Sequence, residues 1–393
     1  MRGIVAALAG IAGIAGIAVV APCGAVAGAQ VVRVRAVEAG SQRPVNGAVV
    51  SLLDGEARRV SPVLADAGGQ AVLRAPAAGS YRVVVERVGY ARWTSPAHAL
   101  AAGDTVEVAA TLPVRRTELA AVAVRGTTEC ATEPAAGTAT AMLWEEVRKA
   151  LEASELTRSQ QPVPLDVRRF ERQLDRALRV QEERASTRRL VAQRPFRSPA
   201  AAELLANGYV RPSAAGDVFA APDAHVLLSD EFVRTHCFAP PRMPARGEGA
   251  GADVVGLDFR PVPSRRVPDI AGTIWVDRAS AELRAVDYRY VNVATVRGAP
   301  HAGGQLAFRR LDDGRWIVER WHIRMPRRGV IRPTGAGAVS AAERDTLLGY
   351  REEGGVATPA AAEPAPGTWR APPPSREVAV AGRRPRAGRA ARR

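Results

Sequence analysis

Histidine, cysteine and acidic side chains are the groups in this sequence that could hold a metal ion. None of the five histidines is followed three residues later by a glutamate, so the His–Glu pairing that holds zinc in many metallopeptidases is absent. His236 and Cys237, with Asp230 or Glu231 close by in the sequence, could begin a metal site, but no second His–Cys pair completes it. The sequence therefore indicates neither a bound metal nor a cofactor.

Nucleophilic and acid–base catalysis lack a recognisable pattern as well. The G-x-S-x-G turn of α/β-hydrolases does not occur, and acids and histidines follow no known catalytic order. The glycine-rich stretch 246–252 runs into strand patterns instead of opening a helix, so it does not predict dinucleotide binding. We expect no catalytic residues and no enzyme. The alternative is a hydrolase in the C-terminal part whose acids, such as Asp253, Asp258 and Asp277, meet only in three dimensions.

The two cysteines that follow the N-terminal segment predict one disulfide. Cys130 and Cys237 form an even pair, and a bridge between them would close a loop of roughly a hundred residues. Chain-entropy estimates give such a loop about 4–5 kcal/mol of stabilisation. The alternative is two unrelated thiols.

Residues 1–29 have the pattern of a secretory signal peptide. Arg2 precedes the apolar run 4–20, and the small residues 27–29 (AGA) predict cleavage before Gln30. A retained membrane anchor and a lipoprotein signal at Cys23 are the alternatives. We therefore expect an exported protein, in the periplasm or outside the cell, with outer-membrane association left open.

The net charge of +15 and the pI near 11.0 do not by themselves indicate nucleic-acid binding. Lys149 is the only lysine among the 55 basic residues. Arginine, alanine, glycine and proline all have GC-rich codons, so a GC-biased genome explains much of the charge. Because export also conflicts with a nucleic-acid partner, we expect none. The arginine-rich end, 383–393, has the charge to contact an anionic surface.

Short apolar runs separated by turn residues predict a β-sandwich near the N-terminus. The turn dipeptide at 54–55 (DG) and the turn at 66–69 (DAGG) punctuate the pattern. The predicted strands lie at 31–37, 47–53, 70–74, 81–88 and 105–112.

The same region resembles the carboxypeptidase regulatory-like domain, a prealbumin-like β-sandwich. The resemblance rests on 44–50 (PVNGAVV), 66–69 (DAGG), 78–83 (AGSYRV) and 88–90 (VGY). Residues 118–126 (ELAAVAVRG) resemble the strand that often follows such a domain in bacterial outer-membrane receptors. The resemblance implies a non-catalytic module that is fused to many different partners.

The rest of the chain predicts a helix and then an antiparallel sheet. Residues 141–151 have helical spacing, whereas 165–181 fit either a helix or strands. Short polar turns join strand patterns at 254–260, 272–277, 281–290, 304–310 and 316–323. This meander resembles the sheet of periplasmic lipoprotein carriers, which implies an apolar ligand.

Five aromatic residues of the meander could line a ligand groove, or simply fill the core between sheet and helix, which we favour. They are Trp275, Tyr288, Tyr290, Trp316 and Trp321.

We therefore expect a mainly β protein of the α+β class, a sandwich plus a meander with a few helices. The expected parts are a signal peptide (1–29), the sandwich (30–126), a helix-containing connector (127–250), the sheet domain (251–330) and a disordered Ala/Pro/Arg-rich tail (331–393). The expected function is binding of an envelope protein or a lipid-like ligand.

Overall fold

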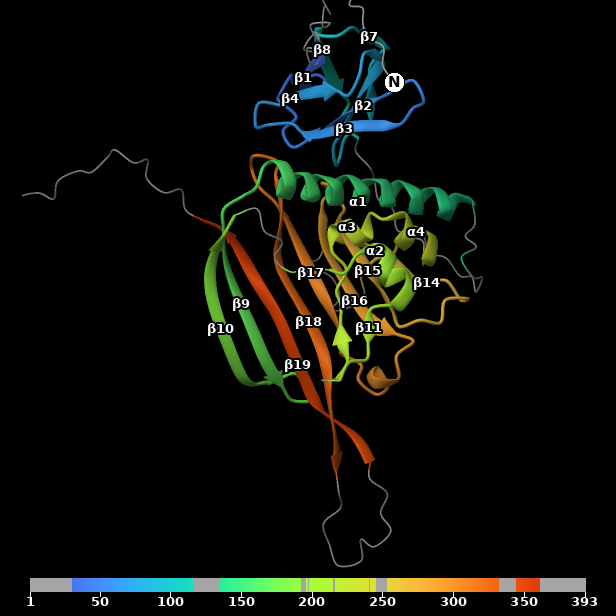
Figure 1. Ribbon diagram of the computed structural model, residues 1–393, viewed down its shortest axis with the longest axis vertical. Helices are drawn as coiled ribbons and strands as arrows, with labels where there is room; N and C mark the ends of the chain where they lie inside the picture. The colour runs from blue at the N-terminus through green and yellow to red at the C-terminus, as the bar shows by residue number, and fades with distance from the viewer. Residues whose placement is uncertain are drawn as a thin grey trace, which may run out of the picture. The chain divides into compact units, whose positions relative to one another are not determined.

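The computed structural model describes most of the chain (Figure 1). Its described residues are 30–115, 130, 134–191, 196, 198–214, 216–239, 241–244, 253–331 and 344–360. The predicted signal peptide, the segment 118–126 and the arginine-rich end lie outside them. Within the described part the fold is mainly β, as predicted. None of the helices described there is long and apolar enough to cross a membrane.

The N-terminal part is a sandwich of two sheets, with strand orders β4-β1-β8 and β3-β2-β5-β6, and with β7 also paired to β5. Alternating residues such as Val32, Leu73, Leu52 and Val83 are buried between the sheets. The strands are β1 (Gln30–Glu38), β2 (Val49–Leu53), β3 (Arg59–Leu64), β4 (Gln70–Ala75), β5 (Gly79–Glu86), β6 (Trp93–Thr94), β7 (His98–Leu100) and β8 (Thr105–Leu112). Five were predicted; β3 was missed because Pro62 interrupts its pattern, which is typical of an edge strand.

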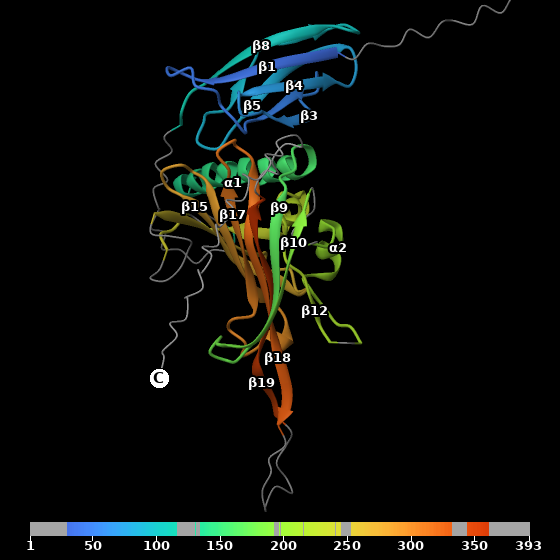
Figure 2. The ribbon, with the colours of Figure 1, turned by 90° about the vertical axis from the view of Figure 1, so that its left-hand side faces the viewer.

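Helix α1 (Pro134–Gln160) contains the predicted helix and is longer than it. Its fully buried side chains are Leu143, Val147, Ala150 and Leu151. The helix contacts β2 and β3 of the sandwich, and also β14, β16 and β18 of the large sheet (Figures 1 and 2). Helix α1 thus packs against both the sandwich and the large sheet.

The second β structure is one antiparallel sheet of nine strands, in the order β10-β9-β19-β18-β17-β16-β15-β14-β13. Successive antiparallel pairs run from β13 to β18, and the predicted meander corresponds to β14–β18. Its strands are β13 (His236–Phe238), β14 (Val254–Pro261), β15 (Asp269–Asp277), β16 (Leu283–Val291), β17 (Gly303–Arg310) and β18 (Trp316–Ile331). The remaining strands are β9 (Leu165–Leu174), β10 (Val180–Leu190) and β19 (Arg344–Pro359).

The prediction of a tail from residue 331 was wrong for residues 344–359, because β19 lies inside the sheet between β18 and β9. Its glycines resemble those of a loop, but they make room for large neighbours. A Cβ on Gly354 would lie 2.6 Å from the Phe170 ring, and one on Gly355 would lie 2.3 Å from the Trp321 ring. Small residues are needed here so that aromatic rings of the adjacent strands can lie against β19.

The predicted connector does not stand apart from the sheet. It supplies α1, the outer strands β9 and β10, and the short helices that pack on the sheet, α2 (Ala201–Asn207), α3 (Ala224–Leu227) and α4 (Asp230–Thr235). The small elements are β11 (Val210–Arg211), β12 (Val218–Phe219) and the 3₁₀ turn η1 (Ala294–Val296). The predicted disulfide is confirmed: Cys130 is bonded to Cys237 in β13, with Cα atoms 5.2 Å apart.

Candidate binding groove

Three of the five predicted aromatic residues lie in the main core. Tyr288, Tyr290 and Trp316 are buried on the face of the large sheet that packs against α1–α4, which we call the helix-facing face. The Tyr288 and Tyr290 rings meet edge to face, with centroids 5.7 Å apart. Burial raises the pKa of both phenols, so they stay neutral. These side chains fill the core.

Trp275 points to the opposite, outer face of the sheet, because it alternates with Ile274 and Val276 of the main core. Its indole Nε1 donates a 2.7 Å hydrogen bond to Asp287 Oδ2, and the Arg242 guanidinium lies 5.1 Å from its ring centroid. Trp275 therefore lies on the opposite face of the sheet from Tyr288, Tyr290 and Trp316, so the five aromatic residues do not form one groove.

Trp321 lies beside an open groove on the helix-facing face of β9, β10, β18 and β19, four strands that we call the wing. The groove has a volume of about 640 Å³. Phe196 approaches Trp321 from the chain beyond β10, with ring centroids 6.3 Å apart. The lining residues are Arg169, Phe170, Glu171, Arg184, Ala185, Ser186, Phe196, Trp321, Ile323, Arg351, Glu353 and Gly354.

The groove combines an apolar floor with charges of both signs. Arg351 bonds Glu171 at 2.8 Å and also contacts Glu353, and all three side chains are nearly half exposed. Arg184, which is more exposed, contacts Glu182 at 2.8 Å. Exposed pairs of this kind add little to stability. Their carboxylates and guanidinium groups remain available to a ligand.

A second cavity next to Phe196 is much smaller. Its volume is about 80 Å³, well below the usual range of roughly 300–1,000 Å³ for ligand pockets. Leu165, Leu306 and Trp316 give it apolar walls, and Glu155 and Arg158 lie at its edge.

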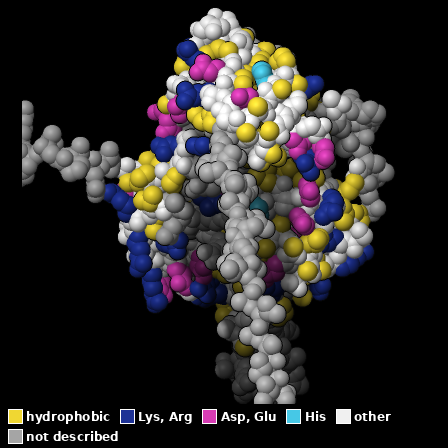
Figure 3. All heavy atoms as spheres, turned by 45° about the horizontal axis from the view of Figure 1, so that its top comes forward, with side chains coloured by type: hydrophobic (Ala, Val, Ile, Leu, Met, Phe, Trp, Pro, Cys, Tyr) yellow, Lys and Arg dark blue, Asp and Glu magenta, His cyan; other side chains and the backbone are white. Residues whose placement is uncertain are grey.

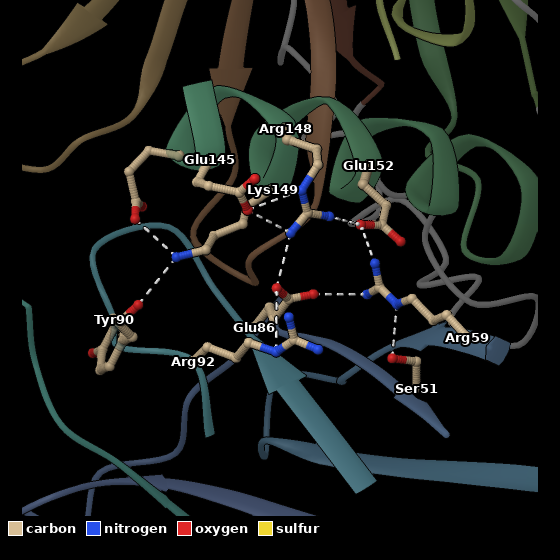
Figure 4. A network of polar contacts seen from close by, with 10 residues as sticks. Ser51, Arg59, Glu86, Tyr90, Arg92, Glu145, Arg148, Lys149 and Glu152 are labelled. Carbon is tan, nitrogen blue, oxygen red and sulfur yellow. Dashed lines mark hydrogen bonds and ion pairs between the residues drawn. The ribbon is translucent and has the colours of Figure 1, made fainter. Parts of the chain in front are cut away.

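A network of ion pairs joins the sandwich to α1 (Figure 4). The Glu86 carboxylate, only 3% exposed, lies 2.8 Å from Arg148 Nη2 and 3.1 Å from Arg59 Nη2. Arg59 and Arg148 also share Glu152, at 2.8 and 3.1 Å. Burial acts to lower the pKa of Arg148, but Glu86 and the helix carboxylates outweigh it and raise the pKa. Each charged group of the network faces an opposite charge from the other element, which favours a structural role.

A buried pair continues this contact along α1. Lys149 Nζ lies 2.8 Å from Glu146 and donates to the Tyr90 carbonyl at 3.1 Å, while Glu146 accepts from the Gly89 amide at 2.9 Å. The single lysine thus helps to bind helix α1 to the turn that follows β5.

The acids considered for catalysis have structural partners. Asp258 accepts from Arg242 and Thr273, and Asp277 accepts from backbone amides of the β15–β16 turn and from Arg284. Cys237 is in the disulfide, and among the described residues no three His, Cys, Asp or Glu side chains gather as a metal site.

The fold therefore defines a β-sandwich module joined to a large antiparallel sheet. Residues 26–113 match the family model of the carboxypeptidase regulatory-like domain, as their motifs predicted. This family model describes a regulatory-like module, often used for interaction, and not a catalytic domain. The resemblance of the C-terminal sheet to lipoprotein carriers is not confirmed by the comparisons.

No curated protein matches the chain. Among solved structures, the Bacillus anthracis TIE protein is similar over 42% of this chain and 26% of its own, with 11% identity and a TM-score of 0.19. At such a low score the likeness defines neither a fold nor a function.

Proposed function

We propose that this protein is an exported, non-enzymatic envelope protein whose wing groove binds an extended segment of a partner protein. The observation that carries the proposal is the groove beside Trp321, whose volume falls within the range of ligand sites. The disulfide supports export, because such bonds persist in oxidising compartments.

The lining favours a peptide over an acyl chain. A lipid tail in the groove would cover Arg169, Glu171, Arg184, Arg351 and Glu353 without offering them hydrogen bonds, which is costly for charged groups. A peptide brings amides and side chains that pair with these groups, and its apolar side chains can lie over the partly exposed Phe196 and Ile323. The 80 Å³ cavity is too small to hold a lipid tail.

The test uses the full chain, purified after export, and a phage-displayed library of random peptides. Enriched peptides are measured against the wild type and against Glu353→Trp, in which a large ring replaces a half-exposed groove side chain. Thr358→Trp is the control, because Thr358 is exposed on the same strand and does not line the groove.

We expect the wild type and Thr358→Trp to bind alike and Glu353→Trp to bind about tenfold more weakly, a change of about 1.4 kcal/mol. Absence of enriched peptides, or equal binding by Glu353→Trp, would overturn the proposal. A native mass spectrum that shows lipid on the gently purified protein would assign lipid carriage instead.

A further inference from the structure

The outermost strand of the wing, β10, has one free edge. Within the described part of the chain it pairs only with β9, and all its residues from Val180 to Arg189 are exposed. An exposed strand of eleven residues presents unpaired backbone donors and acceptors to any second strand. Charged side chains usually keep such edges apart. Their distribution along β10 therefore decides what the edge accepts.

The two acids of β10 lie in its first half, and two of its three arginines lie in its second half, with Arg184 between the two groups. The acids are Glu182 and Glu183, and the two arginines of the second half are Arg188 and Arg189. Figure 3 shows basic side chains concentrated along the left margin, the side on which Figure 1 places β9 and β10. An antiparallel strand with the same sequence brings the acidic half of each copy against the basic half of the other.

We infer that β10 pairs antiparallel with β10 of a second copy of this chain, about a two-fold axis at Ala185. In this register Glu182 stands opposite the partner subunit's Arg188, and Val180 stands opposite the partner subunit's Leu190. Both contacts occur twice, because a two-fold interface is the same from either side. Opposite charges and apolar pairs directly across an antiparallel ladder are stabilising.

The register is selected by side-chain face and by charge. A two-fold axis perpendicular to the sheet keeps the helix-facing sides of both copies together, so only shifts of two residues are allowed. A shift of two in one direction places Arg184 opposite the partner subunit's Arg184, and in the other direction opposite the partner subunit's Arg188. Of these three registers, only the one centred on Ala185 pairs glutamate with arginine without placing like charges opposite each other.

The pairing also joins the two grooves. Arg184 and Ser186 line the groove, and each stands opposite the other across the axis. Because both helix-facing faces are on one side, the dimer has one continuous trough that crosses both wings. This inference does not depend on what the groove binds.

Engineered cysteines test the register in the full chain. Ala185→Cys places two thiols on directly opposed residues, whose Cα atoms are about 4.5–5.5 Å apart in an antiparallel pair, within reach of a disulfide. Thr187→Cys is the matched control. Residue 187 is on the same face of β10, but its two copies are offset by four positions, or about 13 Å. The native cysteines of the exported chain are already paired with each other.

We expect mild oxidation to convert Ala185→Cys, but not Thr187→Cys, into a covalent dimer, and analytical ultracentrifugation to show a wild-type dimer. Arg188→Glu places a glutamate opposite the partner subunit's Glu182, so it should raise the dimer dissociation constant about tenfold or more. The double variant Glu182→Arg with Arg188→Glu restores opposite charges and should restore the wild-type dissociation constant. Arg179→Glu, an equal charge change in the β9–β10 turn, should have little effect. A monomeric wild type, or equal cross-linking at residues 185 and 187, would overturn the inference.

Discussion

Replacing Glu86 by glutamine tests whether the ion-pair network holds the sandwich against α1. The substitution keeps the size of the side chain but removes the charge that faces Arg148 at 2.8 Å and Arg59 at 3.1 Å. Removing one partner of a buried pair typically costs 3–5 kcal/mol, because the remaining charge is left unpaired. Here the two arginine side chains are about a quarter exposed and both keep Glu152, so the expected loss is about 2 kcal/mol.

Urea unfolding of the wild type and Glu86→Gln measures this loss as a lower midpoint at an unchanged slope. Glu145→Gln is the control, because Glu145 bonds the same Arg148 at 3.1 Å but is half exposed. It should cost under about 0.5 kcal/mol. If Glu86→Gln lowers the midpoint no more than Glu145→Gln does, burial of the carboxylate has no bearing on how the sandwich is held.

Three further predictions concern the disulfide, a strand glycine and a partly buried histidine. Cys130→Ser should lower the free energy of unfolding by about 3–5 kcal/mol, measured in urea, and a reductant should shift the wild type but not the variant. Gly355→Val should cost about 1–3 kcal/mol, because its Cβ would lie 2.3 Å from the Trp321 ring; a variant as stable as the wild type would contradict this packing. Burial lowers the pKa of His322 below its usual 6.5, so the unfolded chain takes up the proton first and stability falls as the pH drops below about 6.5. His322→Gln should lose less stability than the wild type between pH 7 and pH 5, and parallel pH profiles would refute the assignment.

The strands that the sequence predicted well are those with local partners. β14–β18 form a meander of successive hairpins, and their alternating apolar residues and short polar turns predict both the strands and the pairing of neighbours. The helix at 141–151 was visible because its buried side chains repeat at helical spacing. The cysteine pair was predicted from the expected export and from the even number of cysteines, without knowledge of where either residue lies.

The wing was not predictable in the same way, because its pairing is long-range. β9 hydrogen-bonds to β19, so Leu174 lies opposite Tyr350, and nothing near either residue indicates the other. The glycines of β19 are typical of a loop in the sequence, but in the structure they leave room for the rings of Phe170 and Trp321. The aromatic residues were divided between two faces by the registers of separate strands, which side-chain type alone does not reveal.

The position of β19 in the sheet has a consequence for how the chain is made. The strand that joins β9 to β18 is the last of the described strands, so a ribosome finishes the β9–β10 hairpin some 170 residues before its neighbour is complete. Until then two strand edges, one on β9 and one on β18, stay open to wrong partners. A chain that terminates or is cleaved before Arg344 keeps both edges open permanently. Such a fragment should aggregate, although it retains every strand that was predicted from local sequence.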